Sequence, residues 1–129
     1  MSVINNKPTA YVYFSISGKE FNPELFKPYF QNAIIQDVIF RNRIKYVRFR
    51  YNANDINEGL DDTLSLILKQ ISPFSQQLRE LIVEDKLYNK FFIVLQNLNS
   101  FRSGGVFFNK EFITLLHQLN TEVEIDLYE

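Results

Sequence analysis

Two segments near the ends of the chain alternate between apolar and polar residues and predict β-strands. In residues 10–17 every second side chain is apolar, and Gly18 ends the run. Residues 122–128 alternate in the same way. Because successive side chains of a strand point to opposite faces of its sheet, each segment is expected to bury one face and expose the other.

Three further runs of strand type lie between these two segments. Residues 38–41 and 44–51 are separated only by Asn42-Arg43, a tight connection that predicts an antiparallel hairpin. Residues 91–95 form a continuous apolar run, which is typical of a central strand covered on both faces or nearly so. The sequence therefore predicts a sheet of about five strands.

Helical spacing fills most of the remaining chain. Asn22-Pro23-Glu24 supplies an N-cap, a proline at the first helical position and an acidic first turn, which predicts a short helix to about Gln31. Apolar residues recur with helical spacing over 60–71, and Pro73 restarts the pattern, so two helices or one kinked helix are expected. Asn109 is the expected N-cap of the last helix.

This order of elements, βαββααβαβ, predicts an α+β fold with a mixed sheet and helices mainly on one face. The strand–helix–strand unit at each end permits a parallel crossover in each half. With 129 residues, 46% of them hydrophobic, the chain can bury one core, and we expect a single domain over residues 1–129. Phe14, Phe92 and Leu116 are expected in that core.

Composition narrows the classes of function. Fourteen basic and fifteen acidic side chains leave a net charge of −1, so no global field draws the protein to nucleic acid or anionic lipid. The absence of cysteine excludes disulfides, thiolate metal sites and a catalytic thiol. The first residues have no signal-peptide pattern, and no apolar run nears the ~20 residues of a membrane span, so a cytoplasmic location without membrane contact is expected.

A pattern at the two ends carries a resemblance to a known family. It comprises residues 11–18 followed by Phe21-Asn22-Pro23-Glu24, and residues 108–112 running on to 124–128. This pattern resembles the uncharacterised bacterial family known as domain of unknown function 4279. The resemblance implies an α+β domain and brings no defined activity and no catalytic residues.

Charges are segregated between predicted strands. The basic set is Arg41, Arg43, Lys45, Arg48 and Arg50, and the acidic set is Glu122, Glu124, Asp126 and Glu129. If the strands are neighbours, Arg48 and Arg50 can pair across the sheet with Glu124 and Asp126. If they are apart, the protein presents a basic–aromatic face that includes Tyr46 and a separate acidic face, an arrangement that selects charged partners.

Residues of catalytic type show no recognisable constellation, and we expect no cofactor and no metal. His117, the only histidine, lies beside the apolar stripe of the last helix, where no function is required of it. Ser103-Gly104-Gly105 lacks the glycine spacing and the lysine of a phosphate-binding loop and is expected to be a connector. Asp61 and Asp62, with Glu58 upstream, suit the N-terminus of a helix.

These observations favour a non-enzymatic protein-binding domain. The most specific form of this hypothesis is an immunity protein that neutralises a co-encoded bacterial toxin, for example a basic nuclease. The residues expected at the contact are Glu122, Glu124, Asp126, Tyr46, Arg48 and Arg50. Two alternatives stay open: an enzyme with an unconventional carboxylate site at Glu58, Asp61 and Asp62, and a nucleic-acid-binding module that uses Tyr46, Arg48 and Arg50. Balanced overall charge disfavours nucleic acid.

Overall fold

The computed structural model describes residues 8–53, 59–97 and 106–128, with the backbone alone at residues 37–41. The strands are β1 (Thr9–Gly18), β2 (Ile34–Arg41), β3 (Ile44–Ala53), β4 (Tyr88–Gln96) and β5 (Glu122–Leu127). The helices are α1 (Gly59–Ile71), α2 (Ser75–Glu84) and α3 (Lys110–Gln118), and the short 3-10 turns are η1 (Pro23–Leu25), η2 (Lys27–Tyr29) and η3 (Ser72–Phe74). None of the described helices is long and apolar enough to cross a membrane.

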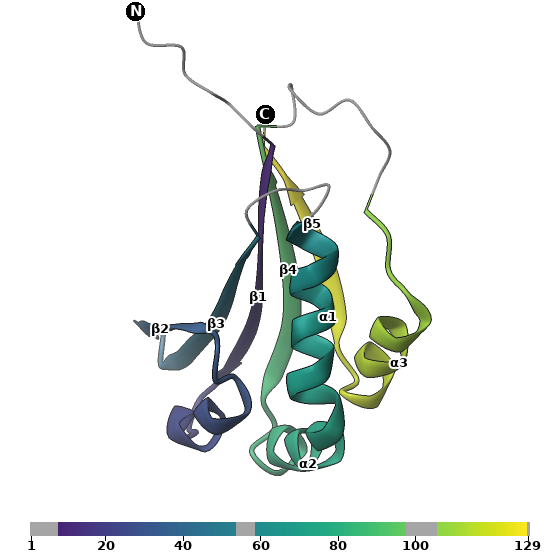
Figure 1. Cartoon of the computed structure of the whole chain (residues 1–129). Helices are drawn as coiled ribbons and strands as arrows, with labels where there is room; N and C mark the ends of the chain where they lie inside the picture. The colour runs from purple at the N-terminus through teal and green to yellow at the C-terminus, as the bar shows by residue number, and fades with distance from the viewer. Residues whose placement is uncertain (1–7, 54–58, 98–105, 129) are drawn as a thin grey trace, which may run out of the picture.

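The five described strands form one mixed sheet in the order β2-β3-β1-β4-β5 (Figure 1). All neighbouring pairs are antiparallel except β4 and β5, which are parallel and are connected through α3. This confirms the predicted α+β fold and the parallel crossover in the second half. The crossover permitted in the first half is absent, because β3 lies between β2 and β1.

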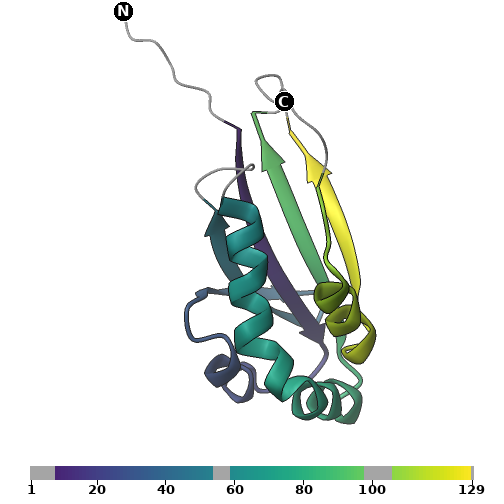
Figure 2. The ribbon, with the colours of Figure 1, turned by 45° about the vertical axis from the view of Figure 1, so that its right-hand side comes forward.

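Helices α1, α2 and α3 lie on one side of the sheet (Figure 2). The core lies between these layers and is rich in aromatic rings. Phe14 of β1 contacts Phe30 and Phe91, with ring centroids 5.5 and 4.5 Å apart, and Phe30 stacks on Phe49 at 4.1 Å. All four side chains are fully buried, so these rings join the turn after β1 to three adjacent strands.

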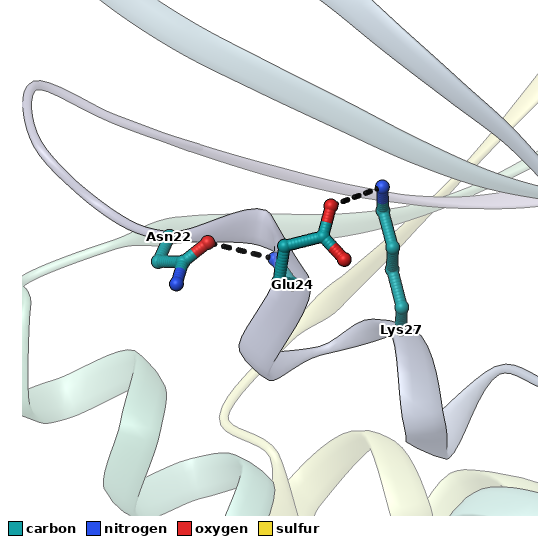
Figure 3. A network of polar contacts seen from close by, with 3 residues as sticks. All are labelled: Asn22, Glu24 and Lys27. Carbon is teal, nitrogen blue, oxygen red and sulfur yellow. Dashed lines mark hydrogen bonds and ion pairs between the residues drawn. The ribbon is translucent and has the colours of Figure 1, made fainter.

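The connection from β1 to β2 contains two 3-10 turns in place of the predicted short helix. Asn22 is the N-cap as predicted, and its Oδ1 accepts a hydrogen bond from the backbone N–H of Glu24 (3.1 Å; Figure 3). Glu24 also forms an ion pair with Lys27 at 2.6 Å. Pro28 has no N–H to donate to an α-helical bond, which explains why the chain does not continue as an α-helix.

The hairpin between β2 and β3 is confirmed. Asn42 and Arg43 have φ angles of 52° and 68°, the left-handed conformation that a two-residue hairpin turn requires. Strand β2 begins at Ile34, four residues before the predicted start at residue 38. Ile34 and Ile35 are both exposed at the edge of the sheet, so the start of β2 has no buried–exposed alternation to reveal it.

Helix boundaries in the second half follow the sequence closely. The turn η3 contains Pro73 and separates α1 from α2, which confirms the predicted break. Asn109 is the N-cap of α3, and its Oδ1 accepts a hydrogen bond from the backbone N–H of Phe112 at 2.8 Å. Capping by Asn109 therefore decides where α3 begins, and Pro73 marks the break after α1.

Two of the three predicted core residues pack in the core. Phe14 is fully buried, and Leu116 is partly buried against the core. The prediction for Phe92 is wrong. Phe91, Ile93 and Leu95 face the helices, whereas Phe92 lies half-buried on the opposite face of the sheet, where no described helix covers it.

Replacement of Phe14 by Ala should destabilise the fold by about 3–5 kcal/mol, because it removes ring contacts and leaves a cavity in the central strand. The matched control is Phe107→Ala, since the Phe107 side chain is 71% exposed, and its free energy of unfolding should change by less than about 1 kcal/mol. Urea denaturation measures both values. Equal effects of the two substitutions would contradict this assignment of the core.

Candidate functional site

The sheet face opposite the helices carries charged and aromatic side chains on four adjoining strands. We call this surface the open face. It comprises Tyr46, Arg48 and Arg50 on β3, Tyr11 and Tyr13 on β1, Lys90 and Phe92 on β4, and Glu122, Glu124 and Asp126 on β5. These residues alternate along their strands with the buried residues that face the helices, which places them together on one surface.

Strand register aligns the open face into transverse rows. In the central row Arg50 is opposite Tyr13, Tyr13 is opposite Phe92, and Phe92 is opposite Glu124. The next row begins with Arg48 and ends with Glu122. The face is therefore basic on β3, aromatic in the centre of the central row and acidic on β5.

Strands β3 and β5 are not neighbours, because β1 and β4 lie between them. The predicted cross-strand pairing of Arg48 and Arg50 with Glu124 and Asp126 is therefore wrong. The strands are apart, as the alternative assumed, but the described members of the two sets on β3 and β5 lie on one face and not on separate faces: Arg48, Arg50, Glu122, Glu124 and Asp126. Strand β1 separates the two charged strands, because it pairs with β3 on one side and, on the other, with β4. Pairing between segments that are distant in the sequence leaves no local pattern from which the strand order could be predicted.

The two arginines of the open face lie over tyrosine rings of β1. Cζ of Arg50 is 3.7 Å from the ring centroid of Tyr11, and Nε of Arg50 donates a hydrogen bond to Oδ1 of Asn52 at 2.8 Å. Cζ of Arg48 is 4.9 Å from the ring centroid of Tyr13. Contacts of this kind contribute about 0.5–1 kcal/mol each at exposed sites. They hold the guanidinium groups in place without neutralising their charge.

Aromatic side chains occupy the centre of the open face. The rings of Tyr13 and Phe92 stack at 4.6 Å, and Nζ of Lys90 lies 5.3 Å from the ring centroid of Phe92. Burial raises the pKa of Tyr13, and the nearby charge of Arg48 opposes this shift only in part. The Tyr13 hydroxyl therefore stays protonated at neutral pH and can donate a hydrogen bond.

The acidic end of the open face contains a coupled pair of carboxyl groups. Nζ of Lys90 binds Oε1 of Glu124 at 2.8 Å, and this hydrogen bond, with a second one from Asp126, lowers the pKa of Glu124. Partial burial and the hydrogen bond to Glu124 raise the pKa of Asp126. Asp126 therefore holds its proton to a higher pH than an ordinary aspartate, while Glu124 is anionic.

The other members of the two charged sets lie outside this surface or outside the description. Lys45 alternates to the helix side of β3, and Arg43 lies in the hairpin turn. The side chain of Arg41 and the whole of Glu129 lie outside the described residues. Only part of each charged set therefore belongs to the candidate site.

Among the described residues, the candidates for metal or acid–base chemistry do not assemble into a site. Asp61 and Asp62 are exposed in the first turn of α1, and His117 is exposed in the last turn of α3. Glu58 and the segment 103–105 lie outside the described residues. Within the described residues no three His, Cys, Asp or Glu side chains are grouped closely enough to hold a metal ion.

Sequence reasoning missed the central residues of the open face, namely Tyr11, Tyr13, Lys90 and Phe92. The tyrosines had a detectable signal, because they occupy the polar phase of an alternating strand. Lys90 and Phe92 had none, since their relation to β5 depends on the strand order. No family model matches the chain, and comparisons with curated proteins and with solved structures found no match.

The contacts of Glu124 and Asp126 predict how these two carboxyl groups titrate. By NMR, Glu124 should titrate at a lower pH, and Asp126 at a higher pH, than the same residue types in an unstructured chain. Lys90→Met should raise the pKa of Glu124, because it removes the hydrogen bond and the positive charge. Lys69→Met, at an exposed position on α1, should leave it unchanged. A pKa of Glu124 raised, or of Asp126 lowered, in the unmodified protein would contradict the described pairing.

Proposed function

We propose that this chain is a non-enzymatic protein-binding domain that recognises its partner through the open face. The observation that supports this most strongly is the row order on that face: arginines at one end, aromatic rings in the centre and carboxylates at the other end. Arginine and large aromatic side chains are the residue types that dominate binding energy at protein interfaces.

The charge balance of the open face favours a protein over a nucleic acid. Arg48, Arg50 and Lys90 are matched by the three carboxyl groups of β5. A nucleic acid backbone crossing the sheet would be attracted at β3 and repelled at β5, whereas a protein surface can offer both signs of charge. The basic residues of β3 thus remain candidates for contact, with a mixed-charge protein as the partner.

The carboxyl groups with shifted pKa values support binding over catalysis. Glu124 and Asp126 lie on the sheet surface, next to Lys90, and neither lines any of four surface cavities whose walls are described residues. An acid–base pair needs a pocket that positions a substrate against it. Their arrangement suits the recognition of a charged surface.

In its sharpest form, the proposal is that the chain is an immunity protein for a co-encoded bacterial toxin. The acidic end on β5 would meet the basic substrate-binding surface of a toxin such as a nuclease, and the aromatic centre would exclude water from the contact. Covering that surface would prevent the toxin from binding its substrate. The resemblance of the two chain ends to a bacterial family agrees with this setting.

The test measures binding to the product of the neighbouring gene. Replacement of Glu122, Glu124 and Asp126 by Lys should lower the association rate constant at least about tenfold and weaken the protection of cells, because steering by complementary charge is lost. Association of the unmodified protein should slow as salt rises.

A matched control changes the same charge on the helix layer. Asp61, Glu80 and Glu84 are exposed on α1 and α2. Their replacement by Lys should leave the association rate constant unchanged within about twofold, since exposed charges away from the contact contribute little. Equal loss in both triple variants would contradict recognition by the open face. The toxin form of the proposal fails if the neighbouring gene product does not bind.

A further inference from the structure

The rows of the open face have an internal symmetry. A line drawn along the sheet between β1 and β4 has an aromatic strand on each side and a charged strand beyond it, with β3 basic and β5 acidic. In the central row, Arg50 and Glu124 are equally far from this line, as are Tyr13 and Phe92. Opposite charges at mirrored positions are the pattern that a self-complementary surface needs.

We propose that a second copy of this chain binds the open face and forms a homodimer with a twofold axis parallel to the strands, above the line between β1 and β4. This rests on the proposed function only in that the open face is a protein contact surface. Rotation by 180° about this axis leaves each row at the same position along the strands and exchanges its β3 end with its β5 end. Arg50 of one copy then faces Glu124 of the other, and Tyr13 faces Phe92.

The charge order selects this axis among the twofold axes that pack two open faces together. An in-plane axis perpendicular to the strands would place β3 over β3 and β5 over β5, with arginine facing arginine. Like charges facing each other across an interface are strongly unfavourable. The axis parallel to the strands gives two Arg50–Glu124 contacts and, in the adjacent row, two Arg48–Glu122 contacts.

The arginines are available for these contacts. The ion pairs seen among the described residues are Lys27–Glu24 and Lys90–Glu124, so neither Arg48 nor Arg50 is matched by a carboxylate there. Cation–π contacts already hold both side chains over β1, so little conformational entropy is lost when a carboxylate binds them.

The size of the open face reaches the lower bound for a specific contact, which is about 500 Å² on each partner. The four strands are about 4.8 Å apart and on average about nine residues long at about 3.3 Å per residue, and together they cover roughly 550 Å² before side-chain relief is counted. A standard interface buries about 800 Å² on each partner. Two sheets packed face to face with their strands aligned would bring most of this surface together.

A dimer formed through the open face would compete with the proposed partner for the same surface. Because the same side chains contact the second copy and the proposed partner, a dimer must dissociate before a toxin can bind the open face. The observed rate of partner binding should therefore rise less than in proportion to the concentration of this chain, an effect that a partner bound elsewhere would not produce.

A charge-swap series measured by sedimentation velocity tests the dimer. Arg50→Glu and Glu124→Lys should each raise the dimer dissociation constant at least about tenfold, which is about 1.4 kcal/mol, because each places like charges face to face. The double variant should return to within about threefold of the unmodified protein, because the exchanged charges are complementary again. Damage within one copy would add in the double variant and could not cancel, since β3 and β5 are not in contact.

Controls separate the interface from the fold. Lys69→Glu and Glu80→Lys make the same changes in net charge on the helix layer and should not alter the dissociation constant. If either single variant fails to fold, Arg48→Glu and Glu122→Lys give the same cycle in the adjacent row. A monomeric unmodified protein at high micromolar concentration, or a double variant as weak as the singles, would overturn the dimer.

The same variants distinguish this proposal from the proposed function. The double variant should self-associate yet fail to bind the neighbouring gene product, whose charges have not been exchanged. A monomer that binds that product through the open face would overturn the dimer and leave the proposed function standing. A dimer that follows the charge-swap pattern without binding that product would support the dimer and overturn the toxin form of the proposed function.

Discussion

The alternation of side chains in β1 is the constraint on which the rest of the structure depends. As the central strand, β1 pairs with β3 and β4 and places Phe14 among the rings of the core, while Tyr11 and Tyr13 are placed on the opposite face. A shift of one residue would exchange these two sets and bury tyrosines in place of the core phenylalanine. The same strand therefore determines the core and the surface proposed for binding.

The described helices lie on one side of the sheet, and the charged and aromatic side chains of the open face lie on the other side. The described helices pack over Phe14 and its neighbours and leave the open face uncovered (Figure 2). Arg48 and Arg50 remain charged over tyrosine rings, and Lys90 partly neutralises the acidic end through Glu124. Such a surface is held in place before any contact forms, which lowers the entropic cost of binding.

The sequence predicted the elements better than their arrangement. Capping by Asn22 and Asn109, the break at Pro73 and the turn at Asn42-Arg43 depend on local chemistry, and all appear in the structure. Strand order depends on pairing between distant segments, so the separation of the two charged sets by β1 and β4 could not be predicted. The misassignment of Phe92 has the same origin, because an apolar run does not show which of its faces is covered.

The central claim is that the open face is the contact surface of this domain. The most direct measurement replaces Phe92 with a photo-crosslinking phenylalanine analogue in cells and identifies the captured protein by mass spectrometry. A matched probe at Val83, which is exposed on α2, reports on the helix layer. If the open face is the contact surface, the probe at Phe92 captures a second copy of the chain or the neighbouring gene product, and the probe at Val83 captures neither. Capture of those proteins at Val83 and not at Phe92 would contradict it.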